Sequence, residues 1–126
     1  MWHDGLIFKL KCNGINGNLL KFLENYLKNR RQRVVLNGTK SEWKNITAGV
    51  PQGSVLGPLL FLVYINDLTD DISCHMRLFA DDSSLFTRVE GIDETHVKIV
   101  KDLQTITNWA HQWKMVFNPD VTKQVF

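Results

Sequence analysis

The 126-residue sequence holds only three prolines and only two cysteines. The scarcity of cysteine argues against the small proteins that disulfides or zinc ions hold together. Cys12 and Cys74 lie far apart, in neither a Cys-x-x-Cys spacing nor a metal-binding spacing with histidine. The sequence therefore indicates neither a zinc site nor a disulfide framework. Two reduced thiols in an intracellular protein, cytoplasmic or nuclear, are the expectation.

Long hydrophobic runs are also missing. The longest one, residues 59–65, is much shorter than the roughly 20 residues that cross a membrane, and it predicts a buried core helix. Within it, Phe61 and Leu62 are expected at the centre of the core. Residues 1–5 lack the basic and apolar regions of a signal peptide. We therefore expect no export and no membrane partner.

A strong excess of one charge sign is absent as well, because 15 Lys and Arg stand against 13 Asp and Glu. The net charge of +2 is unevenly spread: residues 1–44 hold nine basic and three acidic residues, and residues 45–126 hold six and ten. A basic third is thus joined to an acidic remainder. With 44% apolar residues the chain can bury a core, and its length predicts one domain.

Periodicity and turn signals predict a mixture of helices and short strands. In chain order they are a helix over 16–28, a β-hairpin over 34–47, a loop over 49–54, an apolar helix over 57–68, two strands over 75–87, a helix over 93–113 and a short strand over 115–117. Asn16 and Asp93 are the expected helix N-caps, and Asn37-Gly38 is the hairpin turn. Leu103 is expected on the apolar face of the last helix.

Asp81 and Asp82 form the sharpest candidate for chemistry. Adjacent carboxylates at the tip of a strand pair repel one another unless a cation neutralises them, and hard oxygen ligands suit Mg²⁺. Magnesium held in this way can assist phosphoryl transfer. An Asp-Asp pair is also ordinary solvated turn chemistry, so the pair alone does not decide between the two interpretations.

Three other features are compatible with a nucleotide or nucleic-acid ligand. Glycines between residues 49 and 58 allow close approach of a partner, and the Gln52 amide can both donate and accept hydrogen bonds. A basic run could bind phosphates, although a solvated face is the more frequent explanation; its members are Lys28, Arg30, Arg31, Arg33, Lys40 and Lys44. Tryptophans at 43, 109 and 113 could stack on bases, but core packing is more frequent and no function is assigned to them.

Order and spacing together resemble the reverse transcriptases of jockey-like non-LTR retrotransposons over essentially the whole chain. Residues 49–61 (GVPQGSVLGPLLF) and 64–68 (YINDL) resemble the second conserved polymerase block of that family. Residues 78–82 (LFADD) resemble the third block. The fourth block is matched by Trp109, Trp113, residues 114–119 (KMVFNP) and Lys123. Three blocks in the family's order make the match highly specific.

The resemblance implies roles for individual residues. Asp81 would be a ligand of the catalytic magnesium ions, with Asp82 beside it, and Phe79 would lie near the primer end. Pro51, Gln52 and Gly53 would lie along the incoming nucleotide and the template. Lys123 would assist the pyrophosphate leaving group. The resemblance further implies an RNA template, a DNA primer and deoxynucleoside triphosphates as partners.

The family's first block is represented only by its tail, because Trp2 to Leu6 resemble the stretch that follows the block's metal-binding aspartate. Asp4 falls after the catalytic position in this pattern and does not replace that aspartate. The resemblance therefore implies a partial domain over residues 1–126, without fingers and thumb, and an incomplete two-metal site. We expect the isolated chain not to polymerise.

The expected fold is α+β, an incomplete polymerase palm in which an antiparallel sheet with the acidic hairpin is packed against helices. The expected function is RNA-directed DNA polymerisation for a mobile element, by two-metal transfer of nucleotides to a primer 3′ end. A non-catalytic remnant that binds nucleic acid, or is inert, is the alternative. The absent first-block aspartate favours this alternative for the isolated chain.

Overall fold

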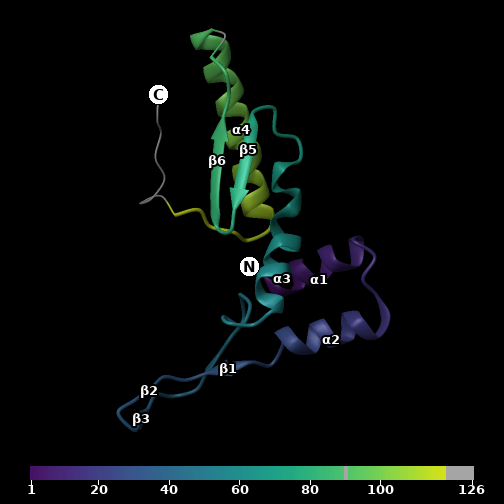
Figure 1. Ribbon diagram of the computed structural model, residues 1–126, viewed down its shortest axis with the longest axis vertical. Coiled ribbons are helices and arrows are strands. Elements are labelled where there is room, and N and C mark those ends of the chain that lie inside the picture. Colours follow the sequence, from purple (N-terminus) through teal and green to yellow (C-terminus); the bar gives the residue numbers. More distant parts are fainter. Residues whose placement is uncertain (90, 119–126) are drawn as a thin grey trace. The chain divides into compact units, whose positions relative to one another are not determined.

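The computed structural model describes residues 1–89 and 91–118, so Lys123 lies outside the described residues. The chain divides into two compact units, residues 1–64 and 65–126, and each is described by itself. Figure 1 shows the elements along the chain. In the ranges that the structure describes, no helix is long and apolar enough to span a membrane.

Two helices begin the first unit: α1 (His3–Cys12) and α2 (Gly17–Leu27). Asp4 in the first turn of α1 and two lysines in its last turn complement the helix dipole. The two helices pack against each other and bury one leucine-rich face each; their buried large apolar residues are Leu6, Ile7, Leu10, Leu23 and Leu27. The predicted helix over 16–28 is confirmed, whereas periodicity had not indicated α1.

The predicted β-hairpin is confirmed and consists of two short ladders. Strand β1 (Arg31–Gln32) pairs antiparallel with β4 (Lys44–Asn45), and β2 (Val35–Leu36) pairs antiparallel with β3 (Thr39–Lys40). Asn37 and Gly38 both have positive φ, 48° and 80°. These angles are required at both central residues of the two-residue turn that matches the twist of a hairpin, and Asn-Gly is its preferred sequence.

The apolar helix α3 (Leu56–Ile65) continues as a 3₁₀ turn, η1 (Asn66–Thr69). It starts one residue before the predicted Gly57-Pro58, so Pro58 lies in its first turn, where proline is tolerated. Leu60 and Tyr64 are buried, Phe61 is half-buried and Leu62 is 55% exposed. The prediction that Leu62 lies at the core centre is therefore wrong. Because α3 is apolar all round, its sequence does not indicate which face packs inward.

The second unit holds the predicted strand pair and the long helix. Strand β5 (His75–Phe79) pairs antiparallel with β6 (Asp82–Phe86), and α4 (Ile92–Gln112) follows (Figure 1). Alternate residues of β5 are half-buried, which gives the sheet one inward and one outward face. All three sheets of the described residues have two strands each, and the palm-like arrangement stays a prediction.

Two details of α4, and the segment that follows it, differ from the prediction. Gly91 is the N-cap, and Asp93 lies inside the first turn, where its charge favours the helix dipole. Leu103 is 49% exposed, and its neighbour Asp102 lies on the buried face instead. The residues 115–117 do not form a strand.

The end of α4 uses Met115, the first residue of the expected strand. Lys114 has a positive φ of 52°, and its N–H donates to the carbonyl of His111 (3.3 Å). The N–H of Met115 donates to the carbonyl of Ala110 (2.8 Å). This pair of hydrogen bonds is a Schellman motif, which uses the residues just after the helix to satisfy its last carbonyls.

Candidate active site

The tip of the β5–β6 hairpin carries the predicted acidic pair. Phe79 ends β5 and pairs with Asp82, the first residue of β6, so that Ala80 and Asp81 form a two-residue turn. Ala80 has a φ of 51°. An L-residue with a Cβ loses roughly 1–2 kcal/mol in this left-handed region. The tight turn places two carboxylates next to each other at a strained point, and such strain often marks a functional site.

The side chains at this tip are open to solvent. Phe79 is 82% exposed, and Asp81 and Asp82 are exposed as well. Within residues 1–89 and 91–118, no cluster of three or more His, Cys, Asp or Glu side chains could enclose a metal ion. Mg²⁺ commonly keeps several waters and is bound through one or two carboxylates. The donor chemistry of the tip therefore fits Mg²⁺ as a partial site of two adjacent carboxylates.

The opposite end of the hairpin is held by Asp102 of α4, a completely buried carboxylate. Its two oxygens accept hydrogen bonds from the backbone N–H of Ser73 (3.1 Å) and from that of Cys74 (2.6 Å). Both donors directly precede β5. Asp102 thus fixes the start of the strand whose far end leads into the acidic turn.

Burial and hydrogen bonding act in opposite directions on the pKa of Asp102. Desolvation raises the pKa, but hydrogen bonds from the Cys74 thiol and from the backbone of Ser73 and Cys74 lower it, and the net shift is downward. The pKa of Cys74 is raised, first by desolvation and then by its hydrogen bond to Asp102. Both shifts keep the carboxylate charged and the thiol protonated.

Sequence reasoning did not identify Asp102. A signal was present, because Ile99, Asp102, Ile106, Ala110 and Trp113 recur at the three- and four-residue spacings of one helix face. An acidic residue inside an apolar stripe indicates a buried, hydrogen-bonded carboxylate.

The side chain of Trp109 connects α4 to η1 within the second unit. Its indole Nε1–H donates to Oδ1 of Asp67 in η1 (2.9 Å). The hydrogen bond connects the C-terminal part of α4 to the 3₁₀ turn that follows α3. Trp109 is half-buried, which agrees with the packing role that was the more frequent expectation for it.

The loop over residues 49–55 belongs to the first unit and is shaped by Ser54. The Ser54 hydroxyl donates to the carbonyl of Pro51 (2.7 Å) and accepts the N–H of Gly57 (3.0 Å). A Cβ on Gly57 would lie 3.0 Å from Ser54 Oγ and 3.3 Å from the Pro51 carbonyl, so only glycine fits without a shift. Gln52 and Gly53 are exposed at the outer side of this compact turn.

The N-terminal segment anchors the beginning of the same loop. His3 Nε2 donates to the carbonyl of Gly49 (2.7 Å), and the N–H of Gly49 donates to the carbonyl of Met1 (2.9 Å). Trp2 forms an antiparallel bridge with Ala48. Gly49 itself has a φ of 83°, which explains a glycine at this position.

A buried lysine supports α3 beneath the loop. Lys9 of α1 is 5% exposed, and its ammonium donates to the backbone carbonyl of Tyr64 (2.6 Å). The same ammonium lies 5.0 Å from the centre of the Tyr64 ring. The phenol oxygen of Tyr64 accepts the N–H of Trp2 (3.3 Å). These contacts tie α1, the N-terminal segment and α3 into one support for the loop.

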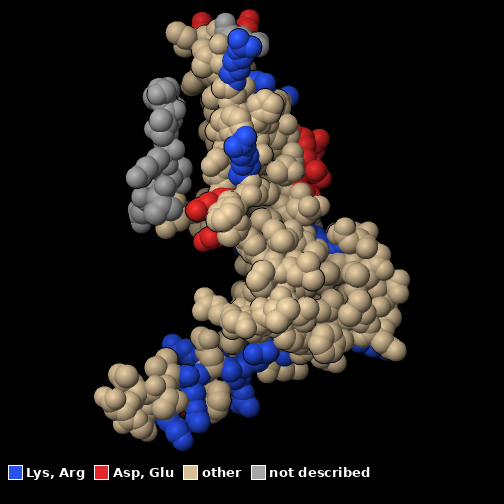
Figure 2. All heavy atoms as spheres, in the orientation of Figure 1, with Lys and Arg blue, Asp and Glu red and all other residues tan. Residues whose placement is uncertain are grey.

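The basic residues Arg30, Arg31 and Arg33 are all exposed. Figure 2 shows Lys and Arg side chains gathered along the β1–β4 hairpin. Arg30 lies over the ring of Tyr26 (5.5 Å), and Arg31 and Arg33 lie over Trp43. Aromatic rings thus hold three guanidinium groups at the surface.

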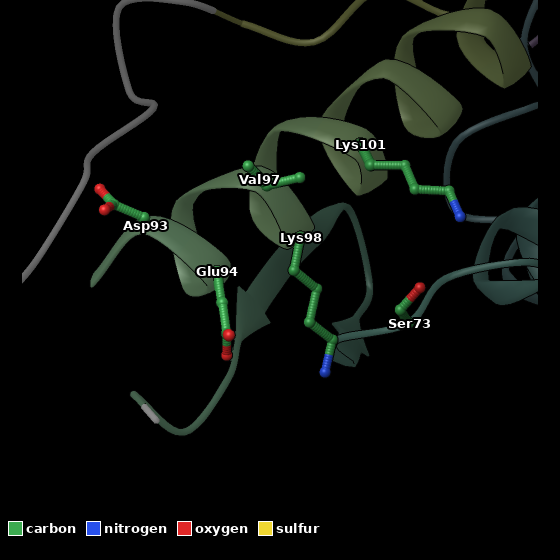
Figure 3. A pocket seen from close by; sticks show the side chains of 6 residues that line it. All are labelled: Ser73, Asp93, Glu94, Val97, Lys98 and Lys101. Carbon is green, nitrogen blue, oxygen red and sulfur yellow. The ribbon is translucent and has the colours of Figure 1, made fainter. Parts of the chain in front are cut away.

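A shallow depression of about 550 Å³ lies elsewhere in the second unit. Figure 3 shows its lining by Ser73 and by Asp93, Glu94, Val97, Lys98 and Lys101 of α4. Ser73 precedes β5, whereas Asp81 follows it, so the depression lies at the end of the strand away from the acidic tip. None of the predicted site residues lines it.

Along the chain, a glycine-containing loop and an apolar helix come first, and an acidic tip between two antiparallel strands follows. This is the order of the polymerase blocks that the sequence resembles. The chain belongs to the reverse transcriptase (RNA-dependent DNA polymerase) family, whose model matches residues 1–126. The resemblance inferred from the sequence is thereby confirmed.

Three of the curated relatives come from mobile elements of Drosophila melanogaster. The chain is 31% identical, over 95% of its length, to the RNA-directed DNA polymerase from mobile element jockey. It is 35% identical over 97% to the probable RNA-directed DNA polymerase from transposon BS, and 32% identical over 99% to that from transposon X-element. In each case the match covers 14% of the relative. No solved structure matches the chain.

Proposed function

We propose that the chain forms part of the palm of an RNA-directed DNA polymerase, which extends a DNA primer along an RNA template. The observation that carries the proposal is the pair of adjacent, exposed carboxylates at the strained tip of the β5–β6 hairpin. The family to which the chain belongs and the names of its relatives support the same reaction.

The hairpin residues would act at the reacting phosphate. Asp81 and Asp82 would hold Mg²⁺, and the exposed Phe79 would lie near the primer end. When bound, the cation supplies charge neutralisation and orients the attacking and leaving oxygens of the phosphoryl transfer. A third acidic ligand is needed to complete a two-metal site, because the described residues bring no further carboxylate, His or Cys into a cluster with this pair.

The loop residues would act on the nucleotide and the template. The exposed amide of Gln52 and the exposed backbone of Gly53 offer donors and acceptors next to Pro51, on a turn that Ser54 holds closed. Lys123 would supply a cation for the pyrophosphate leaving group. We further propose that the family's first-block aspartate supplies the third ligand from a segment beyond this match.

A non-catalytic nucleic-acid-binding role is the second candidate. The observation that favours it is the incomplete acidic cluster at the tip, combined with a fully exposed basic hairpin. In that case, the chain would bind phosphates without using the tip.

Cation binding at the tip tests the proposal on the chain itself. Mn²⁺ can replace Mg²⁺ and broadens the NMR signals of nearby amides. We expect Mn²⁺ to broaden the amide signals of residues 79–83 first, and we expect Asp81→Asn to remove this effect.

The chain offers a matched control in Asp70 and Asp71, a second pair of adjacent exposed aspartates. Replacing both with Asn should leave the broadening at the tip unchanged. Equal broadening at both pairs, or unchanged broadening at the tip in Asp81→Asn, would contradict a cation site at Asp81.

A further inference from the structure

The β1–β4 hairpin differs from the rest of the first unit because it buries no side chain. Every residue from 28 to 45 is exposed. This includes large apolar residues: Leu36 is 70% exposed and Trp43 is 54% exposed. The hairpin therefore leaves apolar as well as basic side chains open to solvent.

The charge of the hairpin indicates the chemistry of its partner. Residues 28–45 hold six basic residues and one acidic residue, Glu42, a net charge of +5. Four of the six flank or belong to the β1–β4 ladder. Such a dense basic surface is complementary to the phosphates of a nucleic acid.

Two arginines and a tryptophan lie together on one face of the hairpin. Arg31 pairs with Asn45 and Gln32 pairs with Lys44. Because side chains alternate along a strand, Lys44 lies on the face opposite Arg31 and Asn45. The guanidinium carbons of Arg33 and Arg31 lie 4.5 Å and 5.9 Å from the centre of the Trp43 ring.

A β-bulge sets this arrangement. Val34 and Ser41 form the next pair, because the N–H of Ser41 donates to the Val34 carbonyl (2.9 Å) and the Val34 N–H donates to Ser41 Oγ (2.9 Å). Between this pair and the Gln32–Lys44 pair, Arg33 alone faces both Glu42 and Trp43. Bulges of this kind redirect side chains and are frequent next to functional sites.

We propose that this face, Arg31, Arg33 and Trp43, binds single-stranded nucleic acid. A base stacks on the exposed part of the Trp43 ring, and the two guanidinium groups, which the ring already orders, bind the adjacent phosphates. Aromatic stacking requires an unpaired base, so the arrangement favours a single strand over a duplex. The inference rests on the proposed function, in which the template enters the polymerase unpaired.

The test is binding of the 126-residue chain to a labelled 12-nucleotide RNA, single-stranded and as a duplex, measured by fluorescence anisotropy. We expect Trp43→Ala to weaken single-strand binding about tenfold, as for the loss of one stacked base, and Trp43→Phe to retain most of it. We expect Arg31→Ala with Arg33→Ala to reduce the slope of log K against log salt by roughly 1.4, because each phosphate contact to a single strand contributes about 0.7.

Lys44→Ala is the matched control, because it removes one charge from the same ladder on the opposite face. It removes one charge without removing the stacking ring, so it should weaken single-strand binding less than Trp43→Ala does. All these residues are exposed, so circular dichroism and urea unfolding should be the same for every variant. The inference is overturned if Trp43→Ala binds the single strand as tightly as the unmodified chain does, or if Lys44→Ala weakens single-strand binding as much as Trp43→Ala does. Tight duplex binding that no variant changes would also overturn it.

Asp81→Asn separates this inference from the proposed function, because Asp81 lies in the other unit. We expect Asp81→Asn to leave RNA binding unchanged. If Asp81→Asn loses the Mn²⁺ effect while Trp43→Ala keeps full RNA affinity, the inference fails and the proposed function stands. If Trp43→Ala alone is defective and the tip binds no cation, the inference stands without the catalytic role.

Discussion

Removing the carboxylate of Asp102 should destabilise the second unit strongly. The side chain is 0% exposed and accepts charge-assisted hydrogen bonds from the Cys74 N–H (2.6 Å) and the Ser73 N–H (3.1 Å). Asp102→Ala loses both bonds and leaves the buried N–H of Cys74 without an acceptor. An unsatisfied buried donor costs about 1–3 kcal/mol, and hydrogen bonds to a charged group contribute about 1.5–3 kcal/mol each. Part of this loss is offset because the variant buries no charge, so we expect roughly 2–4 kcal/mol in total.

The same site gives a pH dependence with a definite sign. The folded-state pKa of Asp102 lies below its ordinary value of 3.8. The folded protein therefore binds this proton less readily than the unfolded chain does. The stabilisation is complete above the ordinary pKa, and it is lost as the pH falls through the folded-state pKa.

Urea unfolding at pH 7 and at a series of pH values below 4 measures both effects. The difference in unfolding free energy between the unmodified chain and Asp102→Ala should be largest at pH 7 and shrink as the pH falls. Asp70→Ala, an exposed acid of the same unit, is the control and should change stability by less than about 0.5 kcal/mol. A difference below 1 kcal/mol at pH 7, or one that grows on acidification, would refute the reasoning.

Three further outcomes are expected. Leu60→Ala should lower the free energy of unfolding in urea by about 2–5 kcal/mol because Leu60 is 2% exposed. Leu62→Ala should lower it by less than about 1 kcal/mol, and equal losses would contradict the assigned helix face. Gly57→Ala should lower the melting temperature, because its Cβ would lie 3.0 Å from Ser54 Oγ, and an unchanged melting temperature would show that the loop adjusts freely. Iodoacetamide at pH 8 should modify the exposed Cys12 well before Cys74, whose burial raises its pKa; mass spectrometry of the peptides would reveal the opposite order.

Local sequence signals predicted much of the fold. The Asn37-Gly38 turn and the positions of both hairpins follow from turn chemistry, and the structure confirms them. These features depend on neighbours in the chain. The helix at 16–28 follows in the same way from apolar spacing, although only Leu23 and Leu27 of its apolar residues are fully buried.

Other features depend on contacts between distant residues. The inward face of α3 is set by the partners of Leu60 and Tyr64, which a uniformly apolar helix does not indicate. The role of Asp102 depends on N–H groups 28 and 29 residues away. The Schellman motif that ends α4 uses the N–H of Met115, the first residue of the expected strand at 115–117, with an acceptor five residues earlier.

The candidate site was predicted in part. The acidic tip and the loop lie on the predicted elements, and the family is confirmed. The metal-ligand roles of Asp81 and Asp82 stay predictions, as do those of the loop residues and of Lys123. Phosphate binding by Arg31 and Arg33 was predicted from the sequence and no function was assigned to Trp43, because only the register and the bulge bring the three side chains together.

Primer extension tests the central claim most directly. These 126 residues would replace the matching segment of a curated relative, and extension of a DNA primer on an RNA template would be measured with Mg²⁺. We expect extension by the unmutated protein, normal extension by the Asp70→Asn control, and none by Asp81→Asn or after removal of the divalent cation. Extension that survives Asp81→Asn would contradict the catalytic assignment, and a properly folded but inactive unmutated protein would contradict the polymerase function of this chain.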